Sequence, residues 1–201
     1  NDTRENFISE NLWPKKILAC IAFSYKEERL DFLVKICQNL ELINKNTRVT
    51  IVVNDLGFSK KELIKKKISE KSSLVIEFFC PQNLLDPRLL PFSHYEVVKE
   101  KIKDNEFTHF LYLEDDILIN EDNIKYWVLA REPLKIYNLI PSFLRIEINS
   151  SNNEKYLVDV TKKNKFYLQP KIFNKKNDFA FINLKSFYAG MYFYDRDLML
   201  E

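Results

Sequence analysis

Glycine is almost absent from this sequence. The 201 residues include two glycines, Gly57 and Gly190, where ordinary usage would give about 14. Two isolated glycines cannot form a G-x-G-x-x-G turn or a P-loop, both of which bring several backbone amides to the phosphates of a nucleotide. If the protein binds a nucleotide, side chains or a metal ion must therefore hold the phosphates.

Cysteine and net charge are also scarce. Cys20, Cys37 and Cys80 lie far apart in apolar stretches, which is typical of reduced thiols in a cytoplasmic protein and excludes a disulfide framework. The chain has 31 Lys and Arg against 29 Asp and Glu, a formal charge of +2, so nucleic acid is not an expected partner.

Long hydrophobic runs are missing as well, although 46% of the residues are hydrophobic. The apolar run Ile17–Phe23 is too short to cross a bilayer, and the polar residues Asn1–Asn11 lack a signal-peptide core. We therefore expect a cytoplasmic protein. The first residue is not Met, and we expect the chain to be a piece of a longer one.

Strand-like and helix-like segments alternate over the first two thirds of the chain. The expected strands are Lys16–Ser24, Thr47–Val53, Ser72–Cys80 and Phe107–Leu113. The expected helices are Glu27–Ile43, one behind a capping box of Ser59 and Glu62, one behind a capping box of Ser93 and Glu96, and one capped by Asn120 and limited by Pro133. This alternation predicts an α/β fold with a mostly parallel sheet and helices on both faces.

The last third has a different pattern. Short β-like runs are separated by turns rich in Lys and Asn: Phe143–Ile148, Tyr156–Thr161, Lys165–Leu168, Phe179–Ile182 and Met191–Tyr194. They predict a smaller mixed or antiparallel β layer. Because composition does not change sharply, we expect one domain over 1–201, with an α/β part at 1–148 and a β part at 149–201.

Three consecutive carboxylates, Glu114, Asp115 and Asp116, follow the apolar strand Phe110–Leu113. Parallel sheets bind ligands beyond the carboxyl ends of their strands. Adjacent carboxylates repel one another, and either water around a turn or a bound cation relieves the repulsion. Oxygen ligands select Mg²⁺ or Mn²⁺. A solvated turn at the start of the next helix is the alternative.

The acidic triplet resembles the DxD-type motif of GT-A glycosyltransferases, with Glu114 in place of the first Asp. An ordered set of further segments resembles a bacterial branch of these enzymes: Phe107–Ile117, Tyr126-Trp127, Arg131–Leu134, Ile140–Glu147, Leu157–Thr161 and Tyr188–Tyr192. The resemblance extends from Ile17 to the end of the chain. It implies the Rossmann-like fold of nucleotide-diphospho-sugar transferases and a hexosyltransferase-like enzyme.

The resemblance also implies site residues. Asp116, the last acid of the motif, becomes the metal ligand, with Glu114 and Asp115 approaching the metal or the ribose. Nucleotide contacts fall at the end of the first strand and after the second, which here are Ser24, Tyr25, Glu27, Asn54 and Asp55. Tyr25 is suited to stacking on a base. The alternative for Asn54-Asp55 is an ordinary turn, because Asn, Asp and Gly are turn residues.

Four other residues need two interpretations each. Arg88 precedes a helix and is either a phosphate ligand or a surface arginine. Arg145 and Glu147 project from one face of a strand, so Glu147 is either the base that takes the acceptor's proton or half of an ion pair. His94, in the first turn of the helix that Arg88 precedes, either faces the site or has the more ordinary role of a packing or surface residue. His109, within the fourth strand, is either a ligand or, as is more ordinary, a core residue.

Together these features predict a metal-dependent glycosyltransferase, with Mn²⁺ or Mg²⁺ and a UDP or GDP sugar as donor. The expected acceptor is a saccharide or glycolipid in surface polysaccharide biosynthesis, with peripheral contact at the inner face of the membrane if the acceptor is membrane-borne. The alternatives are a nucleotidyltransferase of the same fold and a non-catalytic module that binds a glycan or another partner.

Overall fold

The computed structural model describes residues 12–54, 56–82, 84, 86–149, 151–158, 171–174, 179–182 and 190–201. The chain divides into two compact units, Asn1–Val128 with Gly190–Glu201 and Leu129–Ala189. The first unit holds a five-stranded sheet, and the second holds two pairs of short strands. The predicted boundary at residue 148 lies inside the second unit.

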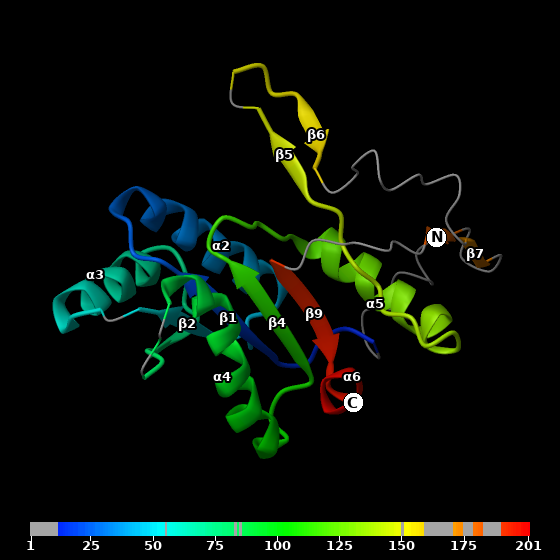
Figure 1. Cartoon of the computed structure of the whole chain (residues 1–201), viewed down its shortest axis with the longest axis horizontal. Helices are drawn as coiled ribbons and strands as arrows, with labels where there is room; N and C mark the ends of the chain where they lie inside the picture. The colour runs from blue at the N-terminus through cyan, green and yellow to red at the C-terminus, as the bar shows by residue number, and fades with distance from the viewer. Residues whose placement is uncertain are drawn as a thin grey trace. The chain divides into compact units, whose positions relative to one another are not determined.

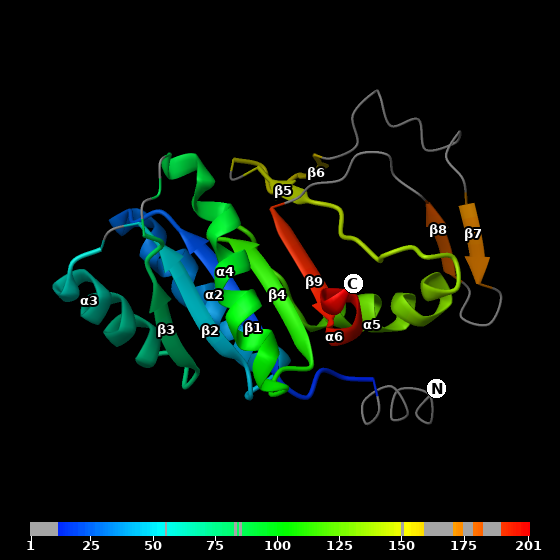
Figure 2. The same ribbon diagram turned by 60° about the horizontal axis from the view of Figure 1, so that its bottom comes forward.

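The five-stranded sheet confirms the predicted α/β class. Its strands are β1 (Ile17–Phe23), β2 (Arg48–Val53), β3 (Val75–Phe79), β4 (His109–Glu114) and β9 (Met191–Asp195). They lie in the order β3-β2-β1-β4-β9, as Figure 2 shows. The first four strands are parallel, whereas β9 runs antiparallel to β4. All seven residues of β1 are buried, which explains why its sequence is an unbroken apolar run.

Helices connect or follow these strands. They are η1 (Glu27–Arg29), α2 (Leu30–Ile43), α3 (Phe58–Ser69), η2 (Pro87–Ser93), α4 (His94–Lys101), η3 (Ile102–Asp104), α5 (Glu121–Lys135) and α6 (Arg196–Leu200). The chain steps outward from β1 to β3 through α2 and α3, then returns past β1 to β4 through α4. Right-handed crossovers therefore place α4 on the face opposite α2 and α3, and Figure 1 shows α4 in front of the sheet.

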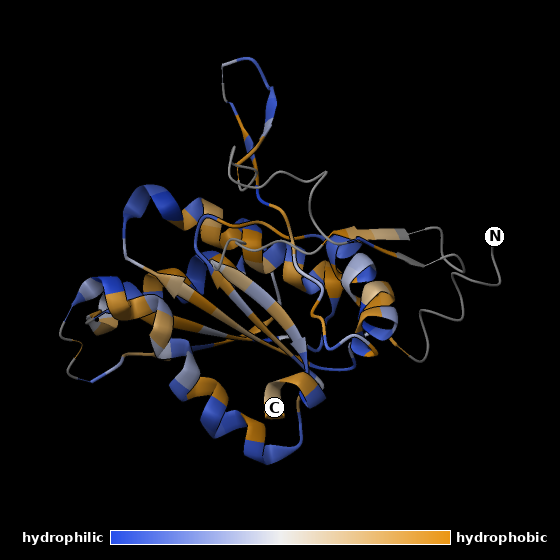
Figure 3. Ribbon diagram, turned by 45° about the vertical axis from the view of Figure 1, so that its right-hand side comes forward, coloured by the Kyte–Doolittle hydropathy of each residue, from blue (hydrophilic) through white to orange (hydrophobic). Residues whose placement is uncertain are grey.

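Apolar side chains fill the space under α4. Leu18 and Cys20 of β1 and Phe110 of β4 form a buried cluster with Val97 and Val98 of α4. The strands are correspondingly hydrophobic, and the helices alternate between hydrophobic and hydrophilic residues (Figure 3). Burial of this kind is the main source of stability of such a layered fold.

On the opposite face of the sheet, the first half of α5 covers β4 and β9. The Trp127 ring packs edge-on against Phe193 of β9, with centroids 4.9 Å apart. His109 of β4 stacks on the same Phe193 ring at 5.1 Å. Trp127 and Phe193 are each 1% exposed, so this aromatic cluster is interior.

Two predicted capping boxes are wrong. Helix α3 begins at Phe58 with Gly57 at its N-cap, so Ser59 already lies inside the first turn. Ser93 has helical dihedral angles because η2 runs directly into α4, which leaves no free helix end for it to cap. The cap of this double segment is Asp86, whose carboxylate accepts a hydrogen bond from the Arg88 amide at 2.9 Å.

The cap at Asn120 is confirmed. Its side-chain oxygen accepts from the Asn123 amide at 3.1 Å, and the Asn123 side chain accepts from the Asn120 amide at 2.9 Å. This reciprocal pair is a capping box with Asn in place of Glu or Gln. Helix α5 ends at Lys135, two residues beyond the predicted limit at Pro133, so the proline lies inside its last turn.

The second unit confirms the smaller antiparallel layer. Strands β5 (Ile146–Ile148) and β6 (Lys155–Leu157) form one antiparallel pair, and β7 (Lys171–Asn174) and β8 (Phe179–Ile182) form another. The expected strand Lys165–Leu168 lies outside the described residues. Strand β7 was not predicted, and β9 pairs with β4 of the main sheet instead of joining this layer. In the part of the chain that is described, no helix combines the length and apolar character needed to cross a membrane.

Candidate functional site

The carboxyl ends of the parallel strands bring the predicted site segments that follow β1, β2 and β4 to one edge of the sheet. Ala22 of β1 pairs with Glu114 of β4, so the residues that follow each strand leave the sheet at the same edge. The amide of Glu114 donates to the Gly190 carbonyl at 3.0 Å, just before β9 begins. We call this side of the sheet, where β1, β2 and β4 end, the carboxyl edge.

The three acidic residues at this edge have different surroundings. The side chain of Asp115 is 6% exposed, whereas that of Asp116 is 59% exposed. Glu114 is half-buried and lies on the α4 face, because it pairs with Ala22 in the same row. From the sequence we expected these acids to form one cluster. In the structure the Asp115 carboxylate is buried and the Asp116 carboxylate is exposed.

An arginine that the sequence analysis missed contacts two of these acids. Nη1 of Arg29 donates to Oδ1 of Asp115 at 2.6 Å, and Nη2 lies 3.6 Å from Oδ2 of Asp116. Arg29 ends η1, directly after β1 and Glu27. Its position in the sequence could have indicated this contact, because Arg29 lies in the segment that follows β1, and that segment starts at the same edge of the sheet as the acidic cluster.

The Asp115 carboxyl group is only partly satisfied by this arginine. Burial raises its pKa and the Asp116 charge adds to that effect, while the Arg29 guanidinium opposes it. Its second oxygen, Oδ2, is buried and has no hydrogen-bond partner among the described residues. A buried acceptor of this kind normally binds a donor or a cation, so the carboxylate has one oxygen left for a ligand.

The donor chemistry of the cluster fits a hard divalent cation, because it consists of carboxylate oxygens. The arrangement is not that of a loaded metal site: among the described residues, no three His, Cys, Asp or Glu side chains are grouped around a common point. Instead, Asp115 and Asp116 are arranged around the Arg29 guanidinium.

The predicted nucleotide contacts lie along the same edge. Ser24 is exposed, and Tyr25 is half-buried against Phe23, with ring centroids 6.2 Å apart. Nζ of Lys60 in α3 lies 4.5 Å from the centre of the Tyr25 ring, a cation–π contact that sequence reasoning did not predict. Glu27 is exposed at the start of η1.

Asn54 follows β2 and lies at the same edge as Ser24, because Val53 pairs with Phe23. Its Oδ1 is buried without a hydrogen-bond partner in the described part of the chain. A second buried acceptor is therefore present at this edge. Asp55, the neighbouring predicted contact, lies outside the described residues.

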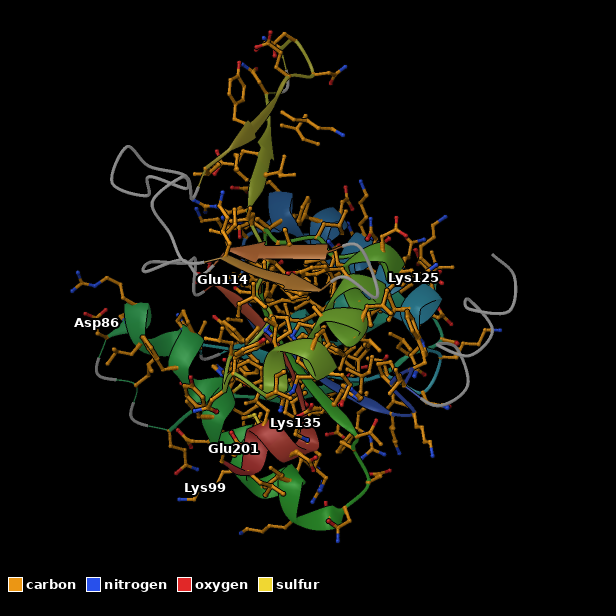
Figure 4. The ribbon with its side chains drawn as sticks, turned by 90° about the vertical axis from the view of Figure 1, so that its right-hand side faces the viewer. Asp86, Lys99, Glu114, Lys125, Lys135 and Glu201 are labelled. Atoms are coloured by element: carbon orange, nitrogen blue, oxygen red, sulfur yellow. The ribbon has the colours of Figure 1, made fainter. Side chains whose placement is uncertain are left out.

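Arg88 projects away from the molecule. Its side chain is 89% exposed and forms an ion pair with Asp86, with Nη2 and Oδ2 2.6 Å apart. Figure 4 labels Asp86, which lies at the outer end of η2, the helical segment that contains Arg88. The hydrogen bonds from Arg88 lower the pKa of the Asp86 carboxyl group. This geometry is that of a surface arginine, and phosphate binding by Arg88 stays a prediction.

Glu147 lies on β5 in the second unit. Its Oε1 is 3.7 Å from Nη2 of Arg145, so the two side chains form the ion pair that the alternation of the strand allowed. The Glu147 side chain is 61% exposed. Its role as a base stays a prediction.

A row of buried aromatic side chains lies beneath Glu114 on the α4 face. Tyr112 precedes Glu114 by two residues and pairs with Tyr192 of β9. The His94 ring stacks on Tyr112 with centroids 4.1 Å apart, which confirms packing as its role. Nδ1 of His94 donates to the Pro91 carbonyl, and burial lowers the pKa of His94 to about 4. The support under Glu114 is therefore uncharged at neutral pH.

Comparison with known proteins gives structural likenesses only. No protein-family model matches the sequence, and no curated protein is significantly similar to it. The fold is similar to residues 1–349 of TarS from S. aureus, with 13% identity and a TM-score of 0.44 over 92% of this chain and 48% of the TarS chain. The chain thus spans about half the length of that relative.

Two further likenesses are weaker. The mannosyltransferase PcManGT from Pyrobaculum calidifontis, in complex with GDP-Man and Mn²⁺, is 8% identical over 65% of this chain and 38% of its own, with a TM-score of 0.39. Core-mannan synthase A from Aspergillus fumigatus, in its Mn/GDP form, is 13% identical over 66% and 42%, with a TM-score of 0.31. Because all three TM-scores are below 0.5, the fold class rests on the strand order described above.

Proposed function

We propose that the protein is a glycosyltransferase that binds a nucleoside-diphosphate sugar at the carboxyl edge of β1, β2 and β4. The observation that carries the proposal is the Asp115 carboxylate at the end of β4. One of its oxygens accepts from Arg29 at 2.6 Å, and the other is buried without a partner among the described residues. A buried anion held in this state is suited to a cation or a hydrogen-bond donor.

The shortage of glycine supports a cation in particular. With only Gly57 and Gly190 in the chain, a glycine-rich amide cradle for the phosphates is excluded. Glu114, Asp115 and Asp116 would hold Mn²⁺ or Mg²⁺, as the resemblance to the DxD-type motif also implies. A divalent cation held there supplies the charge that stabilises a leaving diphosphate.

The chain's own side chains have distinct proposed roles. Exposed Asp116 is the ligand that approaches from solvent, and Tyr25, steadied by Phe23, stacks on the base. Oδ1 of Asn54, which has no partner among the described residues, accepts a hydrogen bond from the base or the ribose. Glu147 takes the proton from the acceptor hydroxyl, which then attacks the anomeric carbon.

The finer assignment follows the sequence resemblance. We propose a UDP or GDP sugar as the donor and a saccharide or glycolipid of surface polysaccharide biosynthesis as the acceptor. For a membrane-borne acceptor, the protein would work at the inner face of the membrane through peripheral contact.

Calorimetric titration of UDP and of GDP tests this proposal, with Mn²⁺ and with a chelator, on the wild-type protein and on Asp116→Asn. The matched control is Asp104→Asn, since Asp104 is an exposed acid of η3 at the opposite end of β4. We expect Mn²⁺-dependent binding that weakens at least about tenfold in Asp116→Asn and is unchanged in Asp104→Asn. Equal binding by all three proteins would contradict the site. Hydrolysis of the sugar nucleotide would then separate an enzyme from a binding module.

A further inference from the structure

The two acidic residues that follow Glu114 share a single positive partner. Nη1 of Arg29 lies 2.6 Å from Oδ1 of Asp115, and Nη2 of the same guanidinium lies 3.6 Å from Oδ2 of Asp116. The guanidinium therefore occupies the space between the two carboxylates. A cation that bound Oδ1 of Asp115 and Oδ2 of Asp116 would have to occupy that same space.

The buried Asp115 carboxylate needs a positive partner between it and Asp116. Its side chain is 6% exposed, so removal of its positive partner would leave a buried and uncompensated charge. Its Oδ2 is already buried without a hydrogen-bond partner in the described part of the chain. Arg29 can therefore leave Asp115 only when another cation arrives.

The Arg29 side chain is partly open to solvent. This side chain is 37% exposed, while the Arg29 backbone is fixed by a hydrogen bond from its amide to the Lys26 carbonyl at 3.0 Å and by buried Leu30 behind it. The guanidinium fork that fits a carboxylate fits a phosphate equally well. A rotation of the Arg29 side chain would exchange one for the other.

We propose that Arg29 is an exchangeable counter-cation of the acidic cluster. It binds Asp115 and Asp116 while no divalent cation is present, and it turns to the phosphate oxygens of a nucleotide once a divalent cation takes the carboxylates. The inference rests on the proposed function, because it assumes that a divalent cation and a diphosphate bind at the carboxyl edge. It makes Arg29 a competitor of the metal and a partner of the diphosphate.

Mn²⁺ titration followed by electron paramagnetic resonance, without nucleotide, tests the competition. Arg29→Gln removes the charge and keeps a polar side chain, and Arg48→Gln is the matched control. Arg48 begins β2 at the opposite end of the sheet and lies 3.5 Å from Glu106 in a partly exposed ion pair. We expect Arg29→Gln to bind Mn²⁺ at least about tenfold more tightly than wild type, and Arg48→Gln to match wild type.

Nucleotide binding at saturating Mn²⁺ tests the second half of the exchange. We expect the affinity for UDP or GDP to fall about tenfold in Arg29→Gln, because the guanidinium contact to phosphate is lost. A merely structural role for Arg29 would weaken the binding of Mn²⁺ and nucleotide together, whereas the exchange moves the two affinities in opposite directions.

A third measurement uses the wild-type protein and so does not depend on the folding of a variant. Arg29 is labelled with phenylglyoxal and its modification rate is read by peptide mass spectrometry. The rate should rise when Mn²⁺ alone is added and fall again when the nucleoside diphosphate follows. A rate that Mn²⁺ leaves unchanged would overturn the exchange.

The outcomes separate the two proposals. Binding of Mn²⁺ that is lost in Asp116→Asn but equal or weaker in Arg29→Gln would overturn the exchange and leave the proposed function standing. Absence of Mn²⁺ binding in every variant, with and without UDP or GDP, would overturn both.

Discussion

Mild acid should destabilise the protein through two buried histidines. Burial lowers the pKa of His94 and of His109 to about 4, from an ordinary value of 6.5. The charge of Asp195 opposes this effect at His109, and the groups around His94 are the tyrosines 95, 112 and 192. Because both histidines take up a proton more readily in the unfolded chain, stability must fall as the pH falls from 6.5 towards 4.

The size of the effect follows from the two shifts. Between pH 7 and pH 5, each histidine should remove about 2 kcal/mol from the free energy of unfolding, so the pair should remove about 4 kcal/mol. Ordinary carboxyl groups contribute little over this interval, because their pKa values in the unfolded chain lie below 5. The loss is comparable with the whole stability of a marginal domain.

Urea denaturation at half-unit steps of pH measures this loss directly. In His94→Asn the side-chain amide replaces the Nδ1 donor to the Pro91 carbonyl, and the loss between pH 7 and pH 5 should be halved. His109→Asn alone should halve it as well, and the double substitution should abolish it. A free energy of unfolding that is flat over this interval in the wild-type protein, or a slope that neither substitution changes, would refute the reasoning.

Two further predictions concern Glu147 and the cysteines. Glu147→Gln should lower kcat for sugar transfer at least about tenfold with little change in KM. The control Glu154→Gln, on the same hairpin, should match wild type. Equal kcat in the two variants would exclude Glu147 as the base. Burial raises the pKa values of Cys20 and Cys37 to about 12, so these thiols should resist alkylation in the native protein. The partly exposed Cys80 should react. Rapid loss of all three thiols without unfolding would contradict the burial of Cys20 and Cys37.

The parallel strands were predictable because their signal is local. The run Ile17–Phe23 is apolar at every position, and such a run is typical of a strand covered on both faces. By contrast, the partner of Met191–Asp195 depends on residues far away in the sequence. These residues resemble the other short strands of the last third, so nothing local indicated that they pair with β4.

The same distinction applies to the site. The acidic triplet is contiguous, and its place after β4 could be inferred from the strand pattern. Arg29 lies 86 residues from Asp115, and only the pairing of β1 with β4 brings the two together. Ser93 shows the converse: its capping pattern was correct locally, but the helical segment before it removed the free end that a cap requires.

The antiparallel strand β9 has a consequence for synthesis of the chain. Until Met191–Asp195 leave the ribosome, the outer edge of β4 has no neighbour, and an open strand edge can pair with another chain. The carbonyl oxygens of Thr108 and Phe107, just before β4, also lack the Arg196 donors until that residue has been made. The Arg196 amide donates to Thr108 at 2.9 Å, and its guanidinium donates to Phe107 at 3.2 Å. Nascent chains halted before Gly190 should therefore need chaperone protection and self-associate in its absence, whereas chains in which residues 191–196 have also emerged should not.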